Sequence, residues 1–126
     1  MRSCTLLACA LGLAVAGCAS PPPVAEAPPP AGQTGIATWY GARHEGRPMA
    51  NGEIFDKEAM TAAHRTLPLG TQVKVTNLGT GRSVRVRITD RCVCRNSIID
   101  LSQSAAATIG IPTQGGGIGQ VRVEEL

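Results

Sequence analysis

The chain has 126 residues, a formal net charge of +3, and a single residue each of Phe, Trp and Tyr. So few aromatic side chains and so weak a positive charge argue against nucleic-acid binding, which needs a basic surface with stacking rings. This length allows one small domain, whose core must be built mainly from Val, Ile, Leu and Ala.

Residues 1–17 are predicted to be a targeting segment. Arg2 supplies a positive charge, and the apolar stretch that follows is too short to span a bilayer. The segment runs into the letters VAGC at residues 15–18, which resemble the bacterial lipobox, so we expect Cys18 to be lipidated and to begin the mature chain. The alternative is an ordinary secretory signal with a chance cysteine. No Asp follows Cys18, and the resemblance therefore implies a lipid anchor in the outer membrane, facing the periplasm.

Residues 18–34 are predicted to be a tether between this anchor and a folded domain. Two runs of three prolines favour extended polyproline geometry and cannot pack a core. The tether is either a spacer that holds the domain away from the membrane or a leader without a length requirement. Residues 35–126 are expected to form one domain.

Alternation of polar and apolar residues predicts the strands of this domain, which are expected at residues 35–41, 71–77, 83–90 and 120–125. The short turn at residues 78–81 makes the second and third of these strands a hairpin. Further short extended runs bring the total to about six strands, which favours a small β-barrel.

Two short helices are expected beside the strands. Asp56 is the predicted N-cap of a helix over residues 55–60. Ser102 is the predicted N-cap of a helix over residues 102–109, which Gly110 ends.

Asp90 is the predicted catalytic residue because it ends a half-buried strand beside a polar loop, where a binding cleft can form. Glu53 follows the turn dipeptide Asn51-Gly52 and is its expected partner. The alternatives are that Asp90 forms a salt bridge with Arg91 at a strand end and that Glu53 is an ordinary loop acid.

Four further residues are weighed between functional and structural roles. Trp39 and Tyr40 point to opposite faces of a strand, so at most one of them is in the core and the other can line a groove. His64 can bind a carboxyl group or substrate, but a structural hydrogen bond is the more common role of such a residue. Asp100 is expected to be structural, bonding backbone near the start of the second helix.

Cys92 and Cys94 are the two cysteines that remain after the predicted targeting segment and Cys18. Residues two apart on an extended chain face the same way, so a disulfide between them is geometrically possible, and an oxidising location favours it. A zinc site would need His44 and His64 as additional ligands, and we expect no metal here.

Five blocks of sequence, in this order and spacing, resemble the rare lipoprotein A (RlpA) family over nearly all of residues 35–126. They read GIATWYG, ANGEIFD, TAAHRTLPLGTQVKVTN, VRVRITDR and IIDLSQSAAATIG. The resemblance implies a mainly β fold, a six-stranded double-psi β-barrel. Family members act on or bind peptidoglycan, and some are lytic transglycosylases.

The resemblance implies catalytic roles for Glu53, His64 and Asp90, and with it we expect Tyr40, Asn51 and Arg91 to bind substrate. The implied reaction cleaves peptide-stripped glycan strands between N-acetylmuramic acid (MurNAc) and N-acetylglucosamine (GlcNAc) and leaves 1,6-anhydro-MurNAc ends. No cofactor is implied, and we expect a monomer. The alternative is a peptidoglycan-binding lipoprotein of the cell envelope without activity.

The sequence departs from the common family pattern in three ways. The usual Asn-Asp-Arg-Gly-Pro is replaced by TDRCV at residues 89–93, and Met49 stands where a Thr is common. The sequence up to Leu126 also contains no C-terminal peptidoglycan-binding repeat of the kind that many members carry. The first departure changes the loop that follows Asp90.

Overall fold

The computed structural model describes residues 12, 17 and 32–126, so nearly all of the expected targeting segment, most of the tether and Cys18 fall outside the described residues. This part of the chain contains six strands and one helix: β1 (Gln33–Tyr40), β2 (Thr61–His64), β3 (Gln72–Asn77), β4 (Ser83–Asp90), β5 (Ile99–Ser102), α1 (Gln103–Thr108) and β6 (Gly119–Glu125). Among these residues there is no helix with the length and apolar character needed to cross a membrane.

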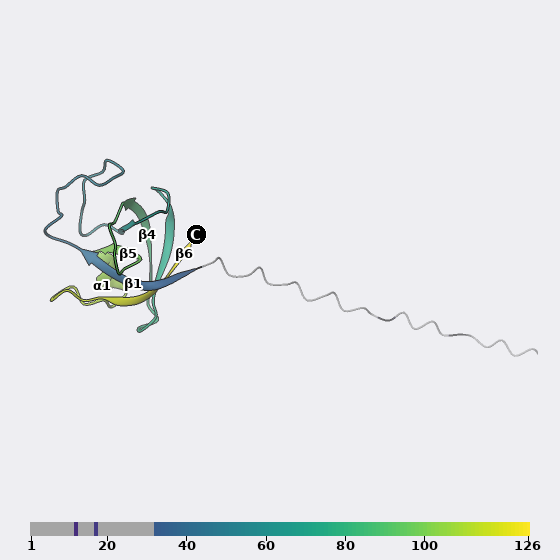
Figure 1. Cartoon of the computed structure of the whole chain (residues 1–126). Coiled ribbons are helices and arrows are strands. Elements are labelled where there is room, and N and C mark those ends of the chain that lie inside the picture. The colour runs from purple at the N-terminus through teal and green to yellow at the C-terminus, as the bar shows by residue number, and fades with distance from the viewer. Residues whose placement is uncertain (1–11, 13–16, 18–31) are drawn as a thin grey trace, which may run out of the picture.

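The six described strands close into a barrel in the order β1-β5-β2-β4-β3-β6. Figure 1 shows the strands curling around one another, with α1 beside them. The pairs β1–β5 and β2–β4 are parallel, and the other pairs are antiparallel. Parallel neighbours cannot be joined by a tight hairpin. The connections after β1 and β4, at residues 41–60 and 91–98, each lead to a strand that is not a barrel neighbour of the strand they leave, and they carry several of the polar residues of interest.

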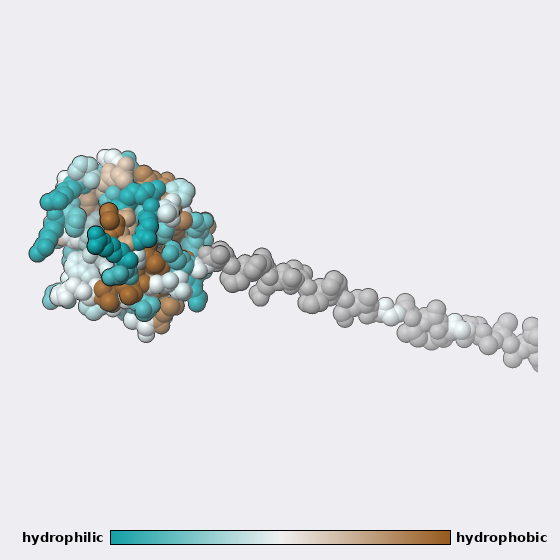
Figure 2. All heavy atoms as spheres, viewed as in Figure 1, coloured by the Kyte–Doolittle hydropathy of each residue, from teal (hydrophilic) through white to brown (hydrophobic). Residues whose placement is uncertain are grey.

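The barrel core is aliphatic, as composition predicts. Its completely buried members include Val73, Val75, Val86, Ile88, Ile99, Leu101 and Val121. The expected hairpin of β3 and β4 is confirmed, with Val73 paired to Val86 and Val75 paired to Val84. Polar and apolar side chains are interspersed over the visible outer face of the barrel (Figure 2).

One of the two expected helices forms. The Ser102 hydroxyl accepts the backbone N–H of Ala105 and so caps α1, and Gly110 follows with a φ of 81° that suits a helix stop. The prediction of a helix over residues 55–60 is wrong. The Asp56 carboxylate accepts the N–H of Glu58 in a local turn, and the chain enters β2 at Thr61 before a helix can develop.

Leu101 offers a direct test of the barrel core. It is completely buried on β5, between Trp39 of β1 and Ala62 of β2 in the strand pairing. We expect Leu101→Ala to lower the free energy of unfolding by about 2–5 kcal/mol because it leaves a cavity. Urea unfolding measures this change. The matched control Ile118→Ala, at a site that is 58% exposed, should change it by no more than about 0.5 kcal/mol. Equal effects of the two variants would contradict the assignment of Leu101 to the core.

Candidate functional site

Strand pairing brings two acids to one level of the barrel wall. Thr38 pairs with Asp100, Asp100 with Ala63, and Ala63 with Asp90, across the neighbouring strands β1, β5, β2 and β4. The register shifts between Ala62 and Ala63 at this level. Such irregularities re-aim side chains and are common beside functional sites. In this register Ala63 is the residue between the two acids.

A groove with a volume of about 390 Å³ lies over this row. Both Asp90 and Asp100 line it, together with residues of β1, of the β1–β2 connection and of the segment after β4. Its other lining residues are Thr38, Trp39, Tyr40, His44, Arg47, Pro48, Met49, Phe55, Ala63, Arg91, Cys92 and Val93. The groove therefore combines two acids with aromatic and basic side chains.

Asp90 is held in the groove by backbone donors. Its Oδ1 accepts the N–H groups of Ala50 and Arg91, both at 2.9 Å. The donor at Ala50 belongs to the β1–β2 connection, which also bonds to the end of β4 through the N–H of Asn51 and the carbonyl of Thr89. The buried Thr89 hydroxyl contacts the sulfur of Met49. The loop thus orients the predicted catalytic acid.

Asp100 is the functional candidate that sequence reasoning assigned a structural role. Its carboxylate accepts the hydroxyl of Thr38 across the β1–β5 pair. Burial raises the pKa of the Asp100 carboxyl, an effect that the charge of His44 partly opposes. The signal in the sequence was an acid that follows the apolar pair Ile98-Ile99, which is the same pattern that singled out Asp90.

Tyr40 lies between these acids and the β1–β2 connection. Its ring stacks on Phe55 at 4.3 Å between centroids and meets His44 edge-on at 5.4 Å. Burial, followed by the charges of Asp90 and Asp100, raises the pKa of the Tyr40 hydroxyl well above its ordinary value. Trp39 packs against the main barrel core and Tyr40 against the small cluster of Ala63, Cys92 and Cys94, and both side chains also line the groove.

Glu53 is not among the residues that line the groove. Its two carboxylate oxygens accept hydrogen bonds from the two terminal guanidinium nitrogens of Arg87, with N···O distances of 3.1 and 2.8 Å. Both side chains are substantially exposed. The hydrogen bonds from Arg87 lower the pKa of the Glu53 carboxyl. Asn51, a predicted substrate-binding residue, also lies outside the lining and accepts the N–H of Glu53 through its side chain.

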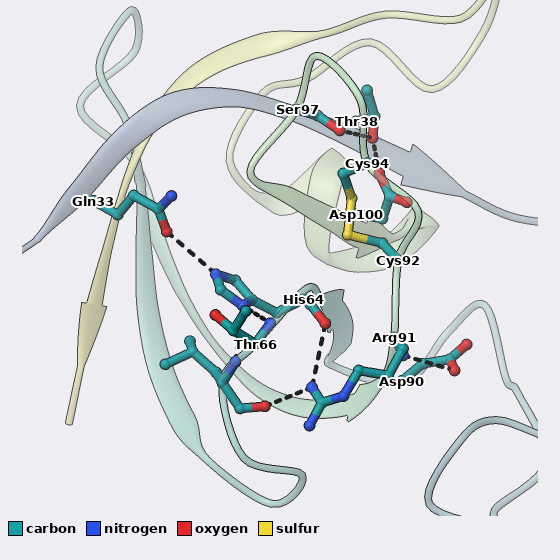
Figure 3. Close-up of a disulfide and its surroundings, with 11 residues drawn as sticks. Gln33, Thr38, His64, Thr66, Asp90, Arg91, Cys92, Cys94, Ser97 and Asp100 are labelled. Atoms are coloured by element: carbon teal, nitrogen blue, oxygen red, sulfur yellow. Dashed lines mark hydrogen bonds between the residues drawn. A yellow bond between two sulfur atoms is a disulfide. The ribbon is translucent and has the colours of Figure 1, made fainter.

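His64 faces a different hollow from the two aspartates. In Figure 3 its imidazole points toward Gln33 while the carboxylate of Asp90 points the other way. Its Nδ1 accepts the N–H groups of Thr66 and Leu67, and its Nε2 lies 3.2 Å from the Gln33 amide oxygen. The guanidinium of Arg91 donates to the carbonyls of His64 and Leu67. These contacts hold the turn after β2 against the end of β4.

Cys92 and Cys94 form a disulfide in the structure, with Cα atoms 5.1 Å apart. Both residues are buried, and Cys92 lines the groove. Val93 between them is 94% exposed at the groove edge. The disulfide therefore forms part of the wall beside Asp100 (Figure 3).

The closed six-stranded barrel with two parallel pairs and an acidic groove defines the class as a double-psi β-barrel protein. The family model described as "Lytic transglycolase" matches residues 32–123. The chain belongs to this family.

Individual relatives agree with this assignment. The chain is 58% identical over 84 residues to a probable endolytic peptidoglycan transglycosylase RlpA of Synechocystis, covering 66% of this chain and 26% of the relative. It is 46% identical over 95 residues to the endolytic peptidoglycan transglycosylase RlpA of Neisseria meningitidis, covering 75% and 39%. The matched segment is therefore a minor part of either relative. Among solved structures, the Streptomyces papain inhibitor has a TM-score of 0.61 at 27% identity, with 80% of this chain and 99% of that chain covered.

The ion pair between Arg87 and Glu53 makes a testable prediction about titration. In Arg87→Gln we expect the pKa of Glu53 to rise toward its ordinary value, because the two guanidinium hydrogen bonds that lower it are removed. Carboxyl-carbon NMR titration measures the change, with the exposed Arg85→Gln on the same strand as the matched control. An unchanged Glu53 pKa in Arg87→Gln would show that this pair does not persist in solution.

The position of His64 predicts how stability depends on pH. Burial and the nearby charges of Arg91 and Arg65 lower the pKa of folded His64, so the unfolded chain binds this proton more readily. The contribution of His64 to the free energy of unfolding is therefore fully present above the ordinary His pKa of about 6.5 and is lost as the pH falls below that value. Urea unfolding measures this effect. When the pH is lowered from 7.5 to 5.5, the free energy of unfolding should fall more in the wild type than in His64→Asn. An equal loss in both proteins would contradict the prediction.

Proposed function

We propose that this chain is a lytic transglycosylase that cleaves peptide-stripped peptidoglycan strands between MurNAc and GlcNAc. Membership of the lytic transglycolase family and the similarity to two proteins named as peptidoglycan transglycosylases support this function. The observation that carries the proposal is the pair of carboxyl groups at one level of a groove, of which Asp100 has a raised pKa.

The reaction needs one proton donor and one proton acceptor. The C6 hydroxyl of MurNAc attacks C1 of the same sugar, the bond to the GlcNAc oxygen breaks, and a 1,6-anhydro ring closes without water. The leaving oxygen must gain a proton, and the attacking hydroxyl must lose one. A donor that keeps its proton near neutral pH needs a raised pKa.

In our assignment Asp100 donates the proton to the leaving oxygen and Asp90 accepts the proton of the C6 hydroxyl. Burial favours the protonated form of Asp100, as a donor requires. The backbone N–H groups of Ala50 and Arg91 both bind Oδ1 of Asp90, so neither occupies Oδ2, which is the oxygen we assign as the proton acceptor. Tyr40 and Arg91 line the same groove and are proposed to contact the sugars.

Glu53 acts as a positioning residue in this proposal. Its pairing with Arg87 of β4 fixes the turn at Asn51, and the neighbouring Ala50 N–H holds Asp90. Loss of the pair would loosen the loop that orients the acid. His64 has a similar supporting role, because it and Arg91 anchor the turn after β2.

The cellular setting belongs to the same proposal. Peptidoglycan as substrate places the domain in the cell envelope, where a lipid on Cys18 would tether it to the outer membrane through the proline-rich segment. The protein would act as a monomer without a cofactor, since the two carboxyl groups supply both proton transfers.

The decisive experiment incubates the protein with peptide-stripped glycan and detects 1,6-anhydro ends by mass spectrometry. We expect Asp90→Asn and Asp100→Asn each to lower the rate roughly 100- to 10,000-fold, since each removes one proton-transfer group. Glu53→Gln should lower the rate less than either of these changes, because Glu53 acts only by positioning the loop that holds Asp90. Asp56→Asn, an exposed acid outside the groove lining, is the matched control and should retain activity.

The outcomes separate an enzyme from a binding protein. Anhydro products from the wild type and Asp56→Asn, but not from Asp90→Asn, would support the transglycosylase. A folded wild-type protein that co-sediments with glycan and forms no product would overturn it in favour of a non-catalytic peptidoglycan-binding protein. Full activity of Asp100→Asn would remove Asp100 from the mechanism.

A further inference from the structure

The Cys92–Cys94 disulfide lies directly beside Asp100 in the wall of the groove (Figure 3). The two sulfur atoms and a carboxylate oxygen of Asp100 all lie within 4.8 Å of one another. The three residues come from two different segments, the β4–β5 connection and β5. The zinc ligands considered from the sequence, His44 and His64, do not belong to this cluster.

The sulfur atoms border a second hollow as well as the groove. This hollow, of about 480 Å³, is lined by Arg65, Cys92, Val93, Cys94 and Arg95. A small reductant can therefore approach the disulfide from outside the groove. Neighbouring arginines favour the thiolate form of a reduced cysteine, which is the form that binds metal ions.

We propose that reduction of this disulfide creates a metal site, in which the thiolates of Cys92 and Cys94 and the carboxylate of Asp100 bind one zinc-class divalent ion. Two sulfur ligands and one oxygen ligand leave a fourth tetrahedral position for water. Thiolates select such borderline-soft ions over Mg²⁺ and Ca²⁺. The three ligands carry three negative charges, so the loaded site keeps one negative charge near Arg65 and Arg95.

The redox step requires a dithiol as reductant. The dithiol gives two electrons and two protons, the Cys92–Cys94 bond breaks, each cysteine becomes a thiol, and the reductant becomes a disulfide. Metal binding then releases both thiol protons, together with the Asp100 proton when that group is protonated. An ion on Asp100 would also block the proton donor of the proposed reaction, and this consequence alone rests on the proposed function.

Metal binding is tested on the full chain with Cys4, Cys9 and Cys18 changed to Ser, so that only the pair can supply thiols. The protein is reduced with dithiothreitol, freed of it under nitrogen, and titrated with Co²⁺. We expect one Co²⁺ per chain with a thiolate-to-cobalt absorption band, which Zn²⁺ abolishes by displacement. The oxidised protein should show no band, and Cys94→Ser should lose about half of its intensity because one thiolate of two is gone.

The role of Asp100 is tested by comparing two acids of the same groove. Asp100→Asn should weaken Co²⁺ binding at least about tenfold, whereas Asp90→Asn, outside the ligand cluster, should not. Far-UV circular dichroism checks that both variants are folded. No band in the reduced protein, equal binding by the oxidised protein, or equal affinities of the two variants would each overturn the proposed site.

Activity measured on the same samples separates this inference from the proposed function. If both hold, Zn²⁺ should stop the formation of anhydro ends by the reduced protein and leave the oxidised protein active. If neither form makes anhydro ends, the proposed function fails while the cobalt titration still decides the metal site. A reduced, zinc-loaded protein with full activity would contradict the assignment of Asp100 as both the metal ligand and the proton donor.

Discussion

The closed ring of hydrogen-bonded strands is the constraint on which the rest of the structure depends. Each strand is paired on both sides, so no strand can slip by a residue without breaking two ladders and turning its core side chains outward. This fixed register puts Thr38, Asp100, Ala63 and Asp90 in one row across four strands. The barrel wall therefore sets the geometry of the groove, because Asp90 and Asp100 both lie on its strands.

Surroundings give the acids different chemistry although all are simple carboxylates. Glu53 is exposed and accepts both arms of the Arg87 guanidinium, which lowers its pKa. Asp100 is half-buried with a single hydroxyl donor from Thr38, and burial raises its pKa. Desolvation penalises the charged form, whereas hydrogen bonds from a cation favour it. A proton donor is consequently expected at Asp100 and a loop clamp at Glu53.

The segment after β4 places the Cys92–Cys94 disulfide next to the acids of the groove. It begins at Asp90, places Cys92 in the groove wall, and reaches β5 only a few residues later. A connection this short must stay close to the strand row, which is why the disulfide lies against Asp100. The disulfide of Cys92 and Cys94 gives this connection redox chemistry of its own.

The sequence by itself determined the elements whose signals are local: the β3–β4 hairpin from alternation, the aliphatic core from composition, and α1 from the Ser102 cap. It also located Asp90, because a strand that ends in an acid is visible along the chain. Tertiary structure alone decided which other acid lies in the groove with Asp90. Asp100 lines the groove, whereas Glu53 pairs with Arg87 and His64 faces Gln33. Strand order and register bring together residues that are far apart in the sequence, and no local pattern encodes which of them meet. The failed helix over residues 55–60 has the same origin, since β2 begins where its pairing with β4 and β5 requires.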